Sequence, residues 1–112
     1  MTDSKSMTRL ELIRLIGDVL TEVDVVRANF MRETATRKRL DNIRDALDTY
    51  QRKLVRSVIK DNTKPFKDLT MSLKEVNENL RQTIESVDKI AQTLEELVKF
   101  VGVVQKIAEL FP

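Results

Sequence analysis

The apolar residues of the chain form three stripes with helical spacing. In the first two stripes, steps of three and four residues separate the apolar positions, and this spacing places them on one face of a helix. The third stripe is longer and follows a seven-residue repeat. All three patterns predict helices, so we predict an all-α fold. The first two stripes comprise Leu12, Ile16, Val19, Val23, Val26 and Phe30, and then Leu40, Ile43, Leu47, Tyr50, Leu54 and Val58.

The seven-residue repeat runs from Phe66 to Phe111. Thirteen of its fourteen a and d positions are apolar, and the exception is Thr83. A repeat of this kind is typical of helices that pack in coiled coils. We therefore predict one uninterrupted helix over residues 66–111. In its last third, further apolar residues widen the stripe, which indicates contact with more than one helix.

The first two stripes do not share one register. Residues 31–39 are mostly polar, and the second stripe is offset from the first by three residues, which is typical of a kink or a break. Thr34 and Thr36 could each cap a new helix, but neither Gly nor Pro marks a turn here. We favour a continuous or kinked helix over residues 8–61, with a break near residues 31–39 as the alternative.

The clearest turn signal is the segment from Asp61 to Pro65. Asp and Asn favour a helix exit, and Pro fits the first turn of the following helix. We predict a turn at 61–65 between the two long helices. Residues 1–7 are predicted to form a flexible tail, and residues 8–112 a single helical domain.

These elements predict a long antiparallel helical hairpin with coiled-coil-like packing. A lone hairpin would leave the broad apolar face of the last helix in water. We therefore expect two hairpins to dimerise into a four-helix bundle. The alternative is a monomeric three-helix bundle with a break near residues 34–37.

The surplus apolar residues of the last helix are the predicted partner-binding surface. We expect these residues to form the interface of the predicted homodimer. They could also dock into the groove of another protein. Membrane-surface binding through residues 97–111 is an alternative function. The surface comprises Val98, Phe100, Val103, Val104, Ile107, Leu110 and Phe111.

A basic stretch is the candidate phosphate-binding surface. Residues 27–60 carry ten basic and four acidic side chains, and Arg37, Lys38 and Arg39 are consecutive. Such a surface could bind nucleic acid through its phosphates. However, Phe30 and Tyr50 lie on the apolar stripes and are not available for base stacking. A charged outer helix face is the favoured interpretation, and nucleic-acid association is the alternative.

The residues expected in catalytic sites are missing. The chain has no Cys and no His, which removes thiolate chemistry, the commonest general base and the commonest metal ligand. Asp41, Asp45 and Asp48 share a helix face, but Arg44 and Arg52 lie within ion-pairing distance, so paired charges are favoured over a metal site. We predict a protein that is not an enzyme, with no cofactor, no metal and no small-molecule substrate.

The predicted function is therefore that of a non-enzymatic structural or interaction protein. It would act through self-association and through binding a protein partner. The N-terminus has no apolar signal segment, and no apolar run is long enough to span a bilayer. A cytoplasmic location is the corresponding expectation.

Overall fold

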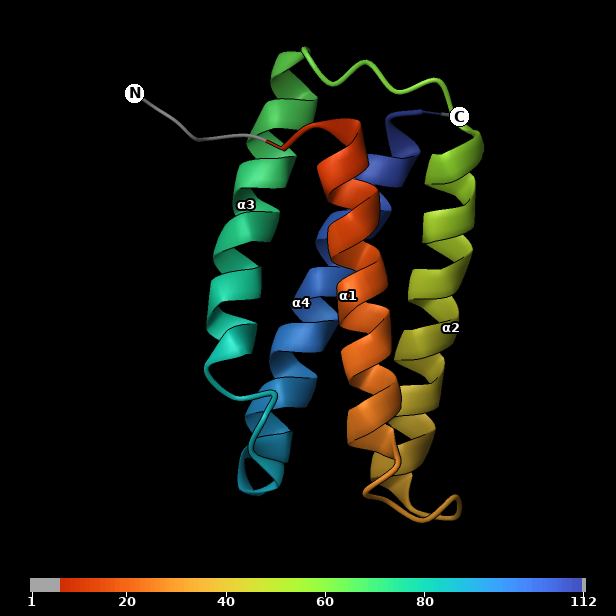
Figure 1. The fold of residues 1–112 in the computed structure, drawn as a ribbon, viewed down its shortest axis with the longest axis vertical. Coiled ribbons are helices and arrows are strands. Elements are labelled where there is room, and N and C mark those ends of the chain that lie inside the picture. Colours follow the sequence, from red (N-terminus) through yellow and green to blue (C-terminus); the bar gives the residue numbers. More distant parts are fainter. Residues whose placement is uncertain (1–6, 112) are drawn as a thin grey trace.

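The computed structural model describes residues 7–111, and every regular element in these residues is a helix (Figure 1). The predicted all-α class is confirmed. Residues 1–6 of the predicted tail lie outside the described residues, whereas Met7 is buried and its backbone N–H donates to the Thr70 hydroxyl at 3.4 Å. The elements are α1 (Arg9–Arg27), α2 (Ala35–Arg56), α3 (Lys64–Arg81), a short 3-10 helix η1 (Val87–Lys89) and α4 (Ile90–Glu109).

The four α-helices lie side by side in a molecule that measures 42 × 30 × 17 Å. α1 and α2 form one antiparallel pair, α3 and α4 form another, and α2 also packs against α4. Residues 57–63, here called the crossover segment, pass over one end of the molecule from α2 to α3 (Figure 1). The break between α3 and α4 lies at the opposite end.

The first stripe forms the buried face of α1. Leu12, Ile16, Val19 and Val23 are fully buried. The helix begins with a capping box, in which the Thr8 hydroxyl accepts from the Glu11 backbone N–H at 3.2 Å and the Glu11 carboxylate accepts from the Thr8 N–H at 2.9 Å. These bonds satisfy two backbone donors that the first turn of a helix leaves free.

The continuous helix favoured over residues 8–61 is wrong, because the chain breaks between α1 and α2. The Thr34 hydroxyl caps α2 by accepting from the Arg37 N–H at 3.2 Å. The Asn29 side chain donates to the carbonyls of Val25 and Val26 at the end of α1. The three-residue offset between the stripes has a simple cause: each stripe belongs to its own helix, and the loop sets their relative rotation. The three-helix alternative, with its break near 34–37, is also replaced by four helices.

The second stripe ends earlier than predicted. α2 stops at Arg56, with Ser57 as its C-cap, and the predicted turn at 61–65 becomes the longer crossover segment. Val58, assigned to the stripe, is 84% exposed. Pro65 does lie in the first turn of α3, with Thr63 as the N-cap.

The uninterrupted helix predicted over residues 66–111 is also wrong. The chain leaves α3 after Arg81 and enters α4 at Ile90, and the reversal is held by backbone bonds from Thr83 and Ile84 to the Leu80 carbonyl at 3.1 and 3.0 Å. This segment contains Thr83, the one polar residue of the repeat. It also contains Ser86 and Val87, and Ser, Thr and Val are weaker helix formers than Ala or Leu.

The reversal gives the seven-residue repeat a partner within the same chain. α3 packs directly on α4, and Phe66, Leu73 and Leu80 of α3 are fully buried. Leu97, Phe100 and Val104 of α4 are also fully buried. α3 and α4 thus cover the apolar face that a single long helix would expose. The sequence argument for dimerisation rested on that uncovered face and no longer holds.

Candidate interaction surface

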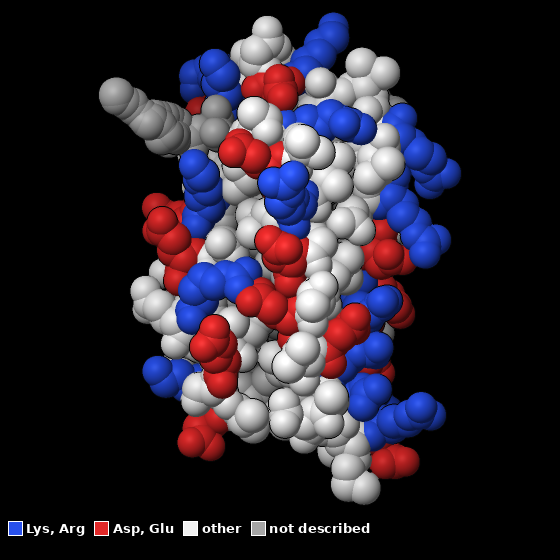
Figure 2. Space-filling view, viewed as in Figure 1, with Lys and Arg blue, Asp and Glu red and all other residues white. Residues whose placement is uncertain are grey.

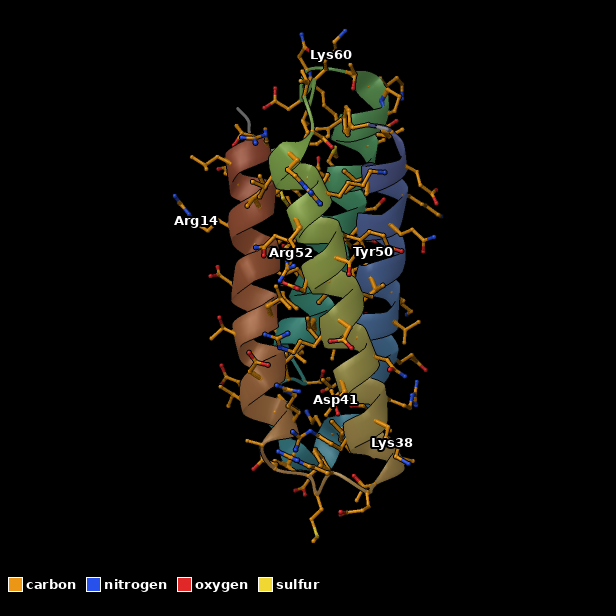
Figure 3. All side chains as sticks on the ribbon, turned by 90° about the vertical axis from the view of Figure 1, so that its right-hand side faces the viewer. Arg14, Lys38, Asp41, Tyr50, Arg52 and Lys60 are labelled. Atoms are coloured by element: carbon orange, nitrogen blue, oxygen red, sulfur yellow. The ribbon has the colours of Figure 1, made fainter. Side chains whose placement is uncertain are left out.

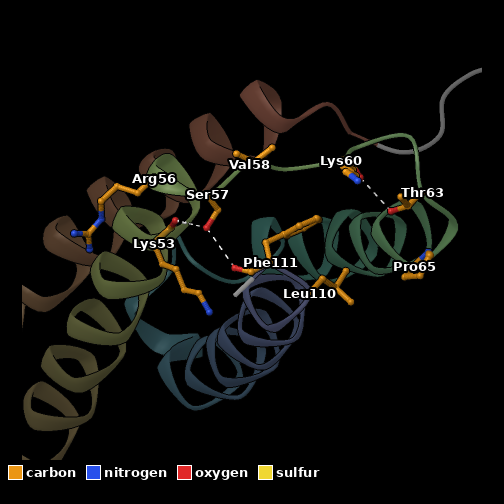
Figure 4. Close-up of a pocket in the computed structure, with 9 residues that line it drawn as sticks. All are labelled: Lys53, Arg56, Ser57, Val58, Lys60, Thr63, Pro65, Leu110 and Phe111. Carbon is orange, nitrogen blue, oxygen red and sulfur yellow. Dashed lines mark hydrogen bonds between the residues drawn. The ribbon is translucent and has the colours of Figure 1, made fainter.

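A large cavity lies where the crossover segment meets the end of α4 (Figure 4). Its volume is about 870 Å³. The walls come from the last turn of α2, the crossover segment, the start of α3 and the end of α4. We call this surface the basic end. Its residues are Lys53, Arg56, Ser57, Val58, Lys60, Thr63, Pro65, Leu110 and Phe111.

Three hydrogen bonds lie in the walls of this cavity, and one of them joins segments that are distant in the sequence. The Ser57 hydroxyl donates to the Lys53 carbonyl at 2.7 Å and to the Phe111 carbonyl at 3.4 Å, so it joins the ends of α2 and α4 (Figure 4). The Thr63 hydroxyl donates to the Lys60 carbonyl at 3.1 Å. Both hydroxyls therefore donate to backbone carbonyl groups.

The charges of the basic end have one sign. Lys53, Arg56 and Lys60 line the cavity, and no Asp or Glu does. Within residues 7–111 none of the three side chains forms an ion pair, whereas nearby Lys64 is neutralised by Asp68 at 2.7 Å. Arg56 points outward in Figure 4 and stands at the rim of the cavity. The cavity is therefore an environment that favours a negatively charged ligand.

Apolar side chains are exposed between these charges. Val58 is 84% exposed and Leu110 is 37% exposed, while Phe111 is half-buried with its ring edge against Phe66. A concave surface that combines exposed apolar groups with a few charges is typical of binding sites. What the basic end offers chemically is positive charge and apolar area.

The predicted partner-binding residues of α4 are divided by the fold. Phe100, Val104 and Ile107 are fully buried in the chain's own core, and Val103 is half-buried. Val98 is 51% exposed, but it faces a separate shallow hollow beside Arg39, Glu95 and Lys99. The structure brings only Leu110 and Phe111 to the basic end.

The predicted phosphate-binding triplet is also divided. Arg37 is held by the loop after α1, because its guanidinium donates to the carbonyls of Arg27 and Phe30 at 3.3 and 3.0 Å. Lys38 and Arg39 are exposed. On the face seen in Figure 2, acidic and basic side chains interleave instead of gathering into one basic patch. Arg37 is thus a structural residue of the α1–α2 loop.

Two of the three acidic residues that share a face of α2 form ion pairs, and Asp45 forms none within residues 7–111. Asp41 lies 2.7 Å from Arg27 and 3.1 Å from Arg37, and Asp48 lies 3.1 Å from Arg52. The bond from Arg27, reinforced by Arg37, lowers the pKa of Asp41, and the same bond raises the pKa of Arg27. In residues 7–111 no group of three acidic side chains is arranged to hold a metal ion.

Sequence reasoning missed most of the basic end. Residues 49–60 contain four basic and no acidic side chains, and this was the available signal. As part of the basic stretch 27–60, this signal did not single out the cavity, because the sequence pattern placed Val58 on a buried stripe and residues 57–61 in a helix. The surface exists only because α2, the crossover segment and the end of α4 meet in three dimensions.

No protein-family model, no curated protein and no solved structure matches the chain. In residues 7–111, no helix combines the length and the apolar character needed to cross a bilayer.

Proposed function

We propose that this chain is a non-enzymatic interaction protein that binds an acidic segment of a protein partner at its basic end. The observation that carries the proposal is the cavity itself, which Lys53, Arg56 and Lys60 line beside exposed Val58 and Leu110, and none of these cations is ion-paired within residues 7–111. Protein interfaces commonly place apolar anchors in a central pocket and charged groups at the rim.

The shape of the surface supports a protein segment as the ligand. A cavity of about 870 Å³ has room for one or two apolar side chains and their backbone. Lys53 and Lys60 approach the cavity from different segments, so two carboxylates spaced along a peptide could pair with them. Each exposed pair contributes little energy alone, so several acidic residues and the apolar contact must act together to give measurable affinity.

The proposal is tested by NMR titration with a hexapeptide that carries two acidic residues on each side of a Phe-Leu pair. We expect the amide signals of Val58, Leu110 and Phe111 to shift. A control peptide with Asn and Gln in place of Asp and Glu should bind weakly, because the charge attraction is lost.

Two charge reversals complete the test. Lys60→Glu should weaken peptide binding by about tenfold, because it replaces an attraction by a repulsion at the rim. Lys38→Glu is the matched control, since Lys38 is an exposed lysine near the other end of the molecule (Figure 3). Equal binding of both peptides, or equal effects of both reversals, would contradict the proposal. So would binding to phosphatidylserine vesicles without any shift on peptide addition.

A further inference from the structure

A second cavity, of about 320 Å³, lies beside the break between α3 and α4. Two carboxylates line it, those of Glu22 and Glu85, and no Lys or Arg does. Val25 and Val87 in its wall are 64% and 49% exposed. We call this surface the acidic end. Its residues are Glu22, Val25, Val26, Asn29, Ile84, Glu85, Ser86, Val87, Ile90 and Thr93.

The carboxylates of the acidic end are only partly satisfied. Arg81 donates to Oε2 of Glu22, while Oε1 is buried and accepts no hydrogen bond from the described residues. Glu85 is exposed and forms no ion pair within residues 7–111. Glu22 is therefore neutralised by Arg81, and the unpaired negative charge of this end is that of Glu85, which lies beside exposed apolar side chains. This is the chemistry that the basic end would recognise.

The two cavities cannot meet within one molecule. The basic end lies at the crossover segment and the acidic end at the reversal between α3 and α4, on opposite ends of the long axis (Figure 1). That axis is 42 Å long. Between two molecules, however, the ends can face each other.

We propose that the basic end binds the acidic end of a second copy of this chain, in a head-to-tail contact. The inference rests on the proposed function and names the partner. Glu85 of one copy would face Lys60 or Lys53 of the other, and the exposed valines would cover the apolar part of the cavity. Because each contact leaves one end of each molecule free, the assembly is open-ended.

The size of the ends limits the strength of this contact. An end face of 30 × 17 Å offers on the order of 500 Å² per chain, which is small for a stable protein interface. The association should therefore be weak, should rise with protein concentration and should fall with added salt. It differs from the side-by-side dimer expected from the sequence, because it uses the ends of the helices and leaves the core closed.

Sedimentation velocity over a concentration series tests the inference. We expect the weight-average mass of the wild-type chain to rise above 13.0 kDa with concentration and to fall back at high salt. Lys60→Glu disables one end and Glu85→Lys the other, so each variant alone should stay monomeric. Lys38→Glu, which changes an exposed lysine outside both cavities, should associate like the wild-type chain. Circular dichroism verifies that all variants keep their helices.

The decisive sample is an equimolar mixture of Lys60→Glu and Glu85→Lys. The first variant keeps its acidic end, the second keeps its basic end, and the two reversed ends are complementary to each other, so the mixture should regain the association that each variant alone lacks. A wild-type chain that stays at 13.0 kDa, single variants that still associate, or a mixture that does not would each overturn the inference. If the wild-type chain is monomeric yet binds the acidic peptide, the proposed function stands and only the second copy as partner is rejected.

Discussion

The ring of Phe66 meets the ring of Phe111 edge-on, with 6.0 Å between the ring centroids and 61° between the ring planes. These residues begin and end the seven-residue repeat, and in one straight helix they would be roughly 70 Å apart at 1.5 Å per residue. Their contact shows how completely the repeat folds back on itself. It also places the end of α4 beside the start of α3, where the basic end forms.

The hydroxyls of Thr93 and Thr83 connect the two sides of this reversal. Thr93 is buried, and its hydroxyl donates to that of Thr83 at 3.0 Å. Thr93→Val keeps the side-chain shape and removes the bond, so it should destabilise the fold by about 0.5–1.5 kcal/mol. Urea unfolding measures the change.

Thr49→Val is the control for this experiment. Thr49 is exposed on α2, and its hydroxyl donates to the Asp45 carbonyl of its own helix. Its replacement should change the free energy of unfolding by less than about 0.5 kcal/mol. Equal effects of the two substitutions would show that the bond between Thr93 and Thr83 does not stabilise the reversal.

The two helix-interior glycines provide a matched pair. A Cβ added at Gly102 meets no atom within 4 Å, whereas one added at Gly17 lies 3.2 Å from Nε2 of Gln51. That amide donates to the Ile13 carbonyl at 3.2 Å, so it cannot move away from an added methyl group without weakening this hydrogen bond. Gly102→Ala should stabilise the protein by up to about 1 kcal/mol, and Gly17→Ala by distinctly less. Thermal unfolding compares them, and equal gains would contradict the close packing at Gly17.

The Asp41 ion pairs make stability depend on pH. Their formation lowers the pKa of Asp41 in the folded state, chiefly through the bond from Arg27. The stabilisation is therefore present above the unfolded pKa, near 3.9, and is lost as the pH falls through the lowered folded value. Asp41→Asn should be less stable than the wild-type chain at neutral pH, and this difference should shrink as the pH falls below the unfolded pKa.

Urea unfolding at several pH values measures this dependence. Asp45→Asn serves as the control, because Asp45 is exposed one turn further along α2 and forms no ion pair within residues 7–111. It should have a smaller effect than Asp41→Asn at neutral pH. A stability difference for Asp41→Asn that stays constant down to about pH 2 would argue against the ion pairs.

Periodicity predicted the helical class and most of the core, because burial follows local spacing. Leu12, Leu40, Leu73 and Leu97 are all buried, as their stripes required. The spacing did not predict where the helices stop. The seven-residue repeat continues in register through the reversal, so only Thr83 and the neighbouring weak helix formers marked it.

The interaction surface was less predictable than the core. Leu110 and Phe111 were among the predicted partner-binding residues, but Phe100, Val104 and Ile107 are covered by the chain's own helices. A helix that packs within its own chain has the same local pattern as one that packs against a second chain. The pattern alone therefore could not decide which side chains stay exposed.

The fold-back of the seven-residue repeat is the claim on which the closed core and both ends depend. Since the chain has no Cys, Lys67→Cys and Lys106→Cys place two spin labels at exposed sites without further changes. Both sites lie at the same end of the molecule. A pulsed electron-spin measurement should therefore give a distance below 30 Å, the width of the molecule. A distance near 60 Å, as 39 residues of straight helix would give, would contradict the fold-back.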